Sequence, residues 1–259
     1  MPLHVEMRGD GPPLVLLHGF TQTGRLWGSF GEGLTRSHTV VALDLPGHAG
    51  SDAVRADLPT TAAMVADAVR HAVGDARCDV LGYSLGARVA LHVLTGTDLA
   101  PTVGHLVCVG VTAGIEDPAE RERRRAADEA AADALETSGD VDRFLNSWLA
   151  GPLFERLGDA ADRAERRRNS APGLASSLRL CGTGTQEPLW GRLGQLRCPV
   201  LALAGTDDSR FSAHALRVAR LAPRGVASLV PGGGHAAHLA QPEHTWRLVE
   251  HWLSAVDPG

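Results

Sequence analysis

The most informative stretch of this sequence is Gly82-Tyr83-Ser84-Leu85-Gly86. It follows an apolar run at residues 78–81 and precedes residues 87–92, whose composition is typical of a helix. A serine flanked by glycines between a strand and a helix is typical of a nucleophile elbow, in which a sharp, strained turn lifts the hydroxyl above the sheet. The pattern therefore predicts that Ser84 is the centre of a reactive site.

Short apolar runs recur on both sides of this stretch and alternate with helical patterns. The runs are typical of buried parallel strands and cover residues 14–17, 39–43, 79–81, 106–109, 199–204 and 227–230. The helical patterns cover about residues 60–73, 85–94, 212–221 and 242–252. This alternation predicts an α/β fold built on a doubly wound, mostly parallel sheet.

The segment from about residue 112 to 188 interrupts this alternation. It contains no convincing strand and is rich in Arg, Glu, Asp and Ala. We therefore expect a helical cap at residues 112–187, inserted into a core formed by residues 1–111 and 188–259. Open α/β sheets bind ligands beyond the carboxyl ends of their strands, so the cap is expected to enclose a pocket above Ser84 and to set specificity.

Composition excludes several kinds of chemistry. All 25 basic residues of the 259-residue chain are Arg, so neither a P-loop lysine nor a pyridoxal Schiff base is possible. Four cysteines (Cys78, Cys108, Cys181 and Cys198) lie far apart without CxxC spacing, which favours reduced core residues over disulfides or zinc ligands. We expect no cofactor and no metal.

The charge pattern and the N-terminus indicate the kind of partner. The formal charge is −5 and the basic residues are scattered, which favours a small-molecule substrate over nucleic acid or a membrane surface. The N-terminus lacks a basic and an apolar signal region, and no stretch is long enough to span a bilayer. These features predict a cytoplasmic protein, and they leave its oligomeric state open.

Candidate partners for Ser84 follow later strands in the required order. A serine hydroxyl needs an adjacent imidazole, itself oriented by a carboxylate, to become reactive at neutral pH. Asp208 follows the run at 199–204, and His235 follows the run at 227–230. The order Ser, Asp, His is the one expected when this triad is built on an α/β-hydrolase sheet.

Two neighbouring residues compete for these roles. Asp207 is an alternative acid, although Asp208 is favoured, and His238 is an alternative histidine. His235 and His238 have a spacing that could bind zinc, but no third ligand is placed near them.

The second oxyanion donor is expected after the first parallel strand. His18-Gly19-Phe20 follows the run at 14–17, so the backbone N–H groups of Phe20 and Leu85 are predicted to form an oxyanion hole. His18 itself needs only a structural role in that loop. The Gly- and Pro-containing loop at residues 44–51 is also interpreted as structural.

Together these positions resemble the α/β-hydrolase superfamily over essentially the whole chain. Four segments also resemble the 2-succinyl-6-hydroxy-2,4-cyclohexadiene-1-carboxylate synthases of menaquinone biosynthesis. They are residues 83–88, 118–125, 181–190 and 234–239, of which Gly182-Thr183-Gly184-Thr185-Gln186 is the least generic part.

The narrower resemblance implies a lyase that removes a ring proton and expels pyruvate without forming an acyl-enzyme. Ser84 would be the base, His235 would accept its proton and Asp208 would orient His235. The resemblance also implies that arginines grip the carboxylates of a polyanionic substrate. The implied substrate-binding residues are Tyr83, Arg88, Arg124, Trp148, Phe154 and Arg168.

Helical spacing supports the inclusion of Arg88 independently. It lies four residues after Ser84, one helical turn along the same face, and a guanidinium is suited to bidentate carboxylate binding. An ion pair with a surface acid is the alternative role for Arg88. Arg123, Arg124 and Arg125 are consecutive, so a shift of one residue would change which of them faces inward, and a solvated helix face is expected for Arg121 and Arg123.

Two other functions remain open on sequence grounds. The same triad would serve a carboxylesterase or a carbon–carbon-bond hydrolase in which Ser84 is a covalent nucleophile. A ligand receptor without catalytic activity on the same fold is a minor alternative, because fold alone does not fix function.

Overall fold

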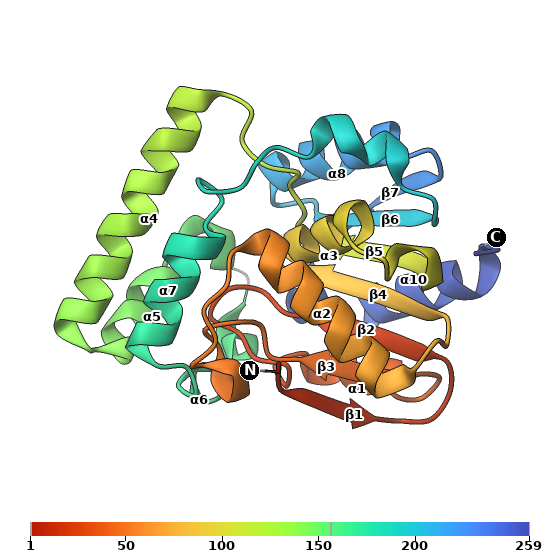
Figure 1. The fold of residues 1–259 in the computed structure, drawn as a ribbon, viewed down its shortest axis with the longest axis horizontal. Helices are drawn as coiled ribbons and strands as arrows, with labels where there is room; N and C mark the ends of the chain where they lie inside the picture. Colours follow the sequence, from red (N-terminus) through yellow and green to blue (C-terminus); the bar gives the residue numbers. More distant parts are fainter. Residues whose placement is uncertain (1, 156, 259) are drawn as a thin grey trace.

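The computed structural model describes residues 2–155 and 157–258, and its strands form one sheet (Figure 1). The sheet has seven strands in the order β1-β3-β2-β4-β5-β6-β7. β1 runs antiparallel to β3, and the other neighbours are parallel. The strands are β1 (Val5–Arg8), β2 (Pro13–Leu17), β3 (Thr39–Leu43), β4 (Cys78–Tyr83), β5 (Val103–Val109), β6 (Val200–Gly205) and β7 (Gly225–Val230).

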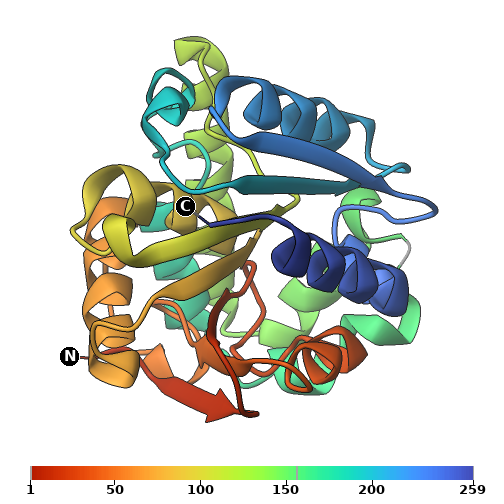
Figure 2. The same cartoon turned by 90° about the vertical axis from the view of Figure 1, so that its right-hand side faces the viewer.

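Helices cover both faces of this sheet, which explains why its strands read as continuous apolar runs. In β6, Val200 and Ala202 contribute to the core under α2, α3 and α8, whereas Leu201 and Leu203 contribute to the core under α1 and α10. Figure 2 shows α2 and α3 on one side of the sheet and α1 and α10 on the other. The core helices are α1 (Gly28–Leu34), α2 (Leu58–Val73), α3 (Leu85–Gly96), α8 (Ser209–Leu221), α9 (Ala237–Ala240) and α10 (Pro242–Ala255).

The predicted α/β fold is confirmed, and β1, α1 and the short helix α9 were not anticipated. The six apolar runs correspond to β2 to β7, and the four helical patterns correspond to α2, α3, α8 and α10. β1 is a short edge strand with partly exposed residues, so it lacks the apolar run of an interior strand. α1 contains three glycines, which disfavour a helix, and it forms where Phe30 and Leu34 are buried against α10.

Among the described residues, four α-helices lie between β5 and β6 and extend over the carboxyl ends of the strands (Figure 1). They are α4 (Pro118–Ser138), α5 (Val141–Leu149), α6 (Arg163–Arg166) and α7 (Ala171–Cys181). All four fall within residues 112–187; the division of the chain into two domains stays a proposal. α4 and α7 pack through small and apolar residues, and Arg179 of α7 pairs with Glu129, Asp133 and Glu136 of α4. No helix in the described part of the chain is long and apolar enough to cross a bilayer.

The turn between β4 and α3 packs closely against β2. A Cβ atom on Gly86 would lie 1.8 Å from the carbonyl oxygen of Leu17, and one on Gly82 would lie 2.5 Å from the carbonyl oxygen of Gly86. Neither position can accept a side chain without backbone movement. The glycines of the predicted elbow are therefore required by packing.

Replacing Gly86 by alanine should lower the free energy of unfolding by at least about 2 kcal/mol, because the added methyl group overlaps backbone of β2. Chemical denaturation measures this change. Gly96→Ala, at the end of the same helix, is the matched control, since its Cβ would meet nothing within 4 Å. This control should stabilise the protein by up to about 0.5 kcal/mol. Equal effects of the two substitutions would contradict the close packing of the turn.

His105 of β5 joins the sheet to the C-terminal segment. Its Nδ1 lies 2.9 Å from Asp79 Oδ1, and its Nε2 lies 2.8 Å from the carbonyl oxygen of Val256. Both partners are acceptors, so both bonds require a doubly protonated ring. Burial disfavours that charge, but the bonds to Asp79 and Val256 outweigh it and raise the pKa of His105.

The stabilisation from His105 should therefore depend on pH. Below about pH 6.5 the ring is charged in both the folded and the unfolded chain, so the stabilisation is complete, and it is lost as pH rises through the raised pKa of the folded protein. His105→Gln should lower the free energy of unfolding by about 1 kcal/mol at acidic pH and by less at alkaline pH. The exposed residue His251, replaced by Gln, serves as the control. A difference between wild type and His105→Gln that stays constant from about pH 5 to 9 would contradict this account.

Candidate active site

Ser84 occupies a strained turn at the carboxyl end of β4. Its backbone angles are φ 50° and ψ −105°, a combination that side-chain-bearing residues rarely adopt. The Ser84 N–H donates to the carbonyl oxygen of Val109 at 2.9 Å, which ties the turn to β5. Strain of this kind concentrates at functional sites, where the surrounding structure holds it. The Ser84 side chain consequently faces a cavity between core and cap.

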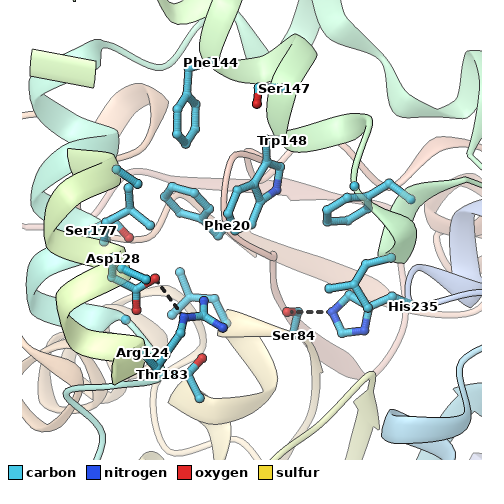
Figure 3. A pocket seen from close by; sticks show the side chains of 18 of the residues that line it. Phe20, Ser84, Arg124, Asp128, Phe144, Ser147, Trp148, Ser177, Thr183 and His235 are labelled. Atoms are coloured by element: carbon cyan, nitrogen blue, oxygen red, sulfur yellow. Dashed lines mark hydrogen bonds and ion pairs between the residues drawn. The ribbon is translucent and has the colours of Figure 1, made fainter. Parts of the chain in front are cut away.

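The structure brings the three predicted triad residues together. His235 Nε2 lies 3.0 Å from Ser84 Oγ (Figure 3), and His235 Nδ1 lies 3.2 Å from Asp208 Oδ2. Asp208 also accepts a hydrogen bond from the N–H of Phe211, at the start of α8. Burial tends to raise the pKa of Asp208, but the bonds from His235 and Phe211 outweigh it and lower that pKa. Because an ionised Asp208 holds the proton on Nδ1, Nε2 is left to accept the Ser84 proton.

The competing residues lie elsewhere. Asp207 accepts a hydrogen bond from Thr206 Oγ1, whereas the bond to His235 comes from Asp208. His238 is buried with its ring 4.5 Å from that of Tyr83, and burial lowers its pKa to about 3, so it is neutral. Within residues 2–155 and 157–258, no group of three or more His, Cys, Asp or Glu side chains is arranged to hold a metal ion.

The loop that carries Phe20 is held by buried neutral histidines. His18 Nδ1 donates to the carbonyl oxygen of Gly19 at 2.8 Å, and His18 Nε2 accepts from the N–H of Leu45 at 3.0 Å. Burial lowers the pKa of His18 to about 4, so this pair of bonds persists at neutral pH. His48 supports the same loop by accepting from the N–H of Thr21. Phe20 and Leu85, the predicted oxyanion residues, both line the cavity beside Ser84.

The cavity has a volume of about 990 Å³, and several aromatic side chains line it. From α5 come Phe144 and Trp148, and the Trp148 ring lies 5.0 Å from the ring of Phe20 (Figure 3). Phe211 lies against His235, with 4.1 Å between ring centroids, and the Phe154 ring centroid lies 6.2 Å from that of His235. Tyr83 is buried beneath His235, and burial raises its pKa. Of the predicted pocket residues, Tyr83, Trp148 and Phe154 all line the cavity.

Arg88 and Arg124 also line the cavity, from α3 and α4. Arg88 is 7% exposed and donates to Gln186 Oε1 at 3.4 Å. No carboxylate of the described residues lies within ion-pair distance of the Arg88 guanidinium. The alternative role, an ion pair with a surface acid, is therefore not seen in the described residues. Burial, with Arg124 nearby, lowers the pKa of Arg88 to about 10, which leaves it protonated at neutral pH. Arg124 pairs with Asp128, 2.9 Å away.

Arg168 is the exception among the predicted substrate-binding residues. It is not part of the cavity wall, and its guanidinium pairs with Glu165 at 2.9 Å. Arg166 is instead the inward residue of this run: it is 1% exposed, donates to the carbonyl oxygen of Ala161 and contacts Thr21 of the Phe20 loop. α6 ends at Arg166, and Arg167 and Arg168 form the turn that follows it. In a run of three consecutive arginines, the sequence does not indicate where the helix ends or which arginine faces inward.

Several cavity residues were not anticipated. They are Asp128, Arg143, Phe144, Arg210 and Phe211. Helical spacing offered a signal for two of them, since Asp128 is four residues after Arg124 and Phe211 is three after Asp208. The others depend on how the cap lies over the core, which spacing does not reveal.

Comparisons with known proteins agree with this architecture. The sequence model of the alpha/beta hydrolase family matches residues 14–245. The chain is 31% identical to the 2-succinyl-6-hydroxy-2,4-cyclohexadiene-1-carboxylate synthase of Serratia proteamaculans (strain 568), covering 96% of this chain and 95% of the relative. Identity to the protein of the same name from Photorhabdus laumondii is 30%, covering 95% and 86%.

Solved structures give the same picture. MenH from S. aureus superposes with a TM-score of 0.89 at 27% identity, covering 97% of this chain and 98% of that one. The esterase RhEst1 from Rhodococcus sp. ECU1013 superposes with a TM-score of 0.76 at 25% identity, covering 98% and 94%. The chain therefore belongs to the α/β-hydrolase family, and within it to the group that includes the 2-succinyl-6-hydroxy-2,4-cyclohexadiene-1-carboxylate synthases.

Proposed function

We propose that this protein is a carbon–oxygen lyase. It eliminates pyruvate from 2-succinyl-5-enolpyruvyl-6-hydroxy-3-cyclohexene-1-carboxylate and forms 2-succinyl-6-hydroxy-2,4-cyclohexadiene-1-carboxylate. The observation that carries the proposal is a cavity in which a serine hydrogen-bonded to histidine faces two arginines. The chain is also 30–31% identical to proteins named as this synthase. The triad alone fits hydrolysis equally well, so the proposal of a lyase rests on the arginines and on the similarity to named synthases.

The proposed reaction begins with proton abstraction by Ser84. As its Oγ takes the ring proton, the serine proton passes to His235 Nε2, and Asp208 stabilises the resulting imidazolium through Nδ1. The electrons of the broken carbon–hydrogen bond form a new ring double bond, the ring double bond already present shifts by one position, and the carbon–oxygen bond to the enolpyruvyl group breaks with its electrons leaving on oxygen. The departing enolate takes up the proton held by His235 and leaves as pyruvate, so no water is consumed.

Charges around the cavity match a polyanionic substrate. Arg88, Arg124, Arg143 and Arg210 line it, against Asp128 and Asp140 among the described lining residues. A guanidinium binds a carboxylate through two parallel hydrogen bonds, and low solvent access strengthens such bonds. The N–H groups of Phe20 and Leu85 are proposed to stabilise negative charge that develops next to the deprotonated carbon.

The first test is direct assay for pyruvate. Wild-type protein given the enolpyruvyl substrate should release pyruvate, and Ser84→Ala should lower kcat by at least about 1,000-fold, because the base is removed while the binding groups remain. A coupled assay that follows NADH oxidation by lactate dehydrogenase measures this release.

A parallel assay with p-nitrophenyl acetate separates the lyase from an esterase. Efficient ester turnover without any pyruvate would establish the hydrolase alternative and refute the proposal. Thermal unfolding of Ser84→Ala is the control, since a loss of activity caused by misfolding would lower its midpoint.

The second test concerns the cationic wall. Arg88→Met keeps an unbranched apolar stem at this buried position but removes the charged guanidinium, so KM for the enolpyruvyl substrate should rise at least about tenfold while turnover of a neutral ester changes little. The matched control is Arg247→Met, at an exposed position of α10. Equal losses on both substrates would mean that Arg88 supports the fold and does not bind a carboxylate.

A further inference from the structure

Asp128 lies at the arginine end of the cavity, on the cap helix α4. Its Oδ1 accepts a hydrogen bond from Arg124 Nε at 2.9 Å (Figure 3). The two side chains differ in environment: that of Arg124 is 38% exposed, whereas that of Asp128 is 7% exposed. Burial therefore immobilises Asp128, and its hydrogen bond restricts the position of the more exposed Arg124.

The second oxygen of Asp128 is buried and has no hydrogen-bond partner among the described residues. A buried carboxylate oxygen without a partner is costly. A Cβ atom on Gly182 would lie 2.5 Å from that oxygen and 2.4 Å from the carbonyl oxygen of Leu178, so there is no room for a side chain at residue 182 beside Asp128. The buried acid therefore lowers local stability, and the hydrogen bond that its side chain accepts comes from Arg124.

The segment at residues 182–186 joins Asp128 to the second arginine. At Gly184 a Cβ would lie 2.3 Å from the backbone nitrogen of Arg125, so this segment lies directly on α4. Gln186, at its other end, accepts the hydrogen bond from Arg88. Thus one short segment contacts both the acid that holds Arg124 and the core residue Arg88.

We propose that Asp128 is a positioning residue that fixes Arg124, so that the guanidinium groups of Arg124 and Arg88 together bind one carboxylate of the substrate. The identity of that substrate rests on the proposed function; the positioning role does not. An arginine without this partner loses side-chain freedom when it binds, whereas one already held by Asp128 loses less.

Charge and positioning predict opposite effects for Asp128→Asn, which makes the test decisive. If the acid only opposed the substrate electrostatically, its neutralisation would tighten binding and lower KM. Positioning predicts that KM for the enolpyruvyl substrate rises about tenfold while kcat changes by less than about threefold, because Ser84 and His235 are untouched. A lower KM would overturn the proposal.

Asp133→Asn is the matched control. It lies on the same helix and pairs with Arg179 on the exposed side, away from the cavity, so its KM and kcat should equal those of wild type. The double variant Asp128→Asn with Arg124→Met separates positioning from general support of the cap. It should be no worse than Arg124→Met alone, since the acid acts through that arginine, and effects that multiply would refute the proposal.

A crystal structure of Asp128→Leu, which removes both oxygens that can accept from Arg124, tests the role without any substrate. The Arg124 guanidinium should leave the place it has beside residue 128, while Arg88, Ser84 and His235 stay unchanged. An Arg124 that keeps its place in this variant would overturn the proposal. If wild type releases no pyruvate, the proposed function fails, and this structural result still decides whether Asp128 positions Arg124.

Discussion

The hydrogen bond from Ser84 Oγ to His235 Nε2 is the interaction on which the rest of the site depends. It exists only because the chain holds Ser84 at φ 50° on a turn that packs against β2 without room for a side chain at Gly86. Asp208 and His235 reach the same place because parallel strands end at one edge of the sheet. The sheet therefore supplies a rigid frame, and the strain at Ser84 is balanced by the packing of β2, β4 and α3.

The triad alone does not determine the reaction, so the residues that the cap adds to the cavity matter. An activated serine can attack an acyl carbon or remove a proton, and the same three residues serve either reaction. The cap adds an aromatic wall and Arg124, while the core contributes Arg88 from one helical turn beyond the serine. We propose that this cavity binds carboxylates at one end and holds a ring carbon near Ser84 at the other. Proton removal is favoured when the ligand is fixed in that orientation.

Sequence patterns revealed the parts of the molecule that follow local rules. Buried parallel strands are apolar on both faces, so β2 to β7 were predictable, and the order Ser84, Asp208, His235 predicted the triad. α1 was not predictable, because its glycines disfavour a helix that only tertiary packing stabilises. Arg168 was expected in the pocket, but it pairs with Glu165, and Arg166 is the buried arginine of this run. Cap positions of this kind depend on contacts between distant segments, which no local pattern encodes.

The central claim is that Ser84 acts as a base and forms no covalent intermediate. The most direct measurement is the intact mass of the wild-type protein, quenched in acid at intervals while pyruvate is being released. The account predicts an unmodified mass at every time point. A mass increase that maps to Ser84, and that disappears when substrate is exhausted, would contradict it.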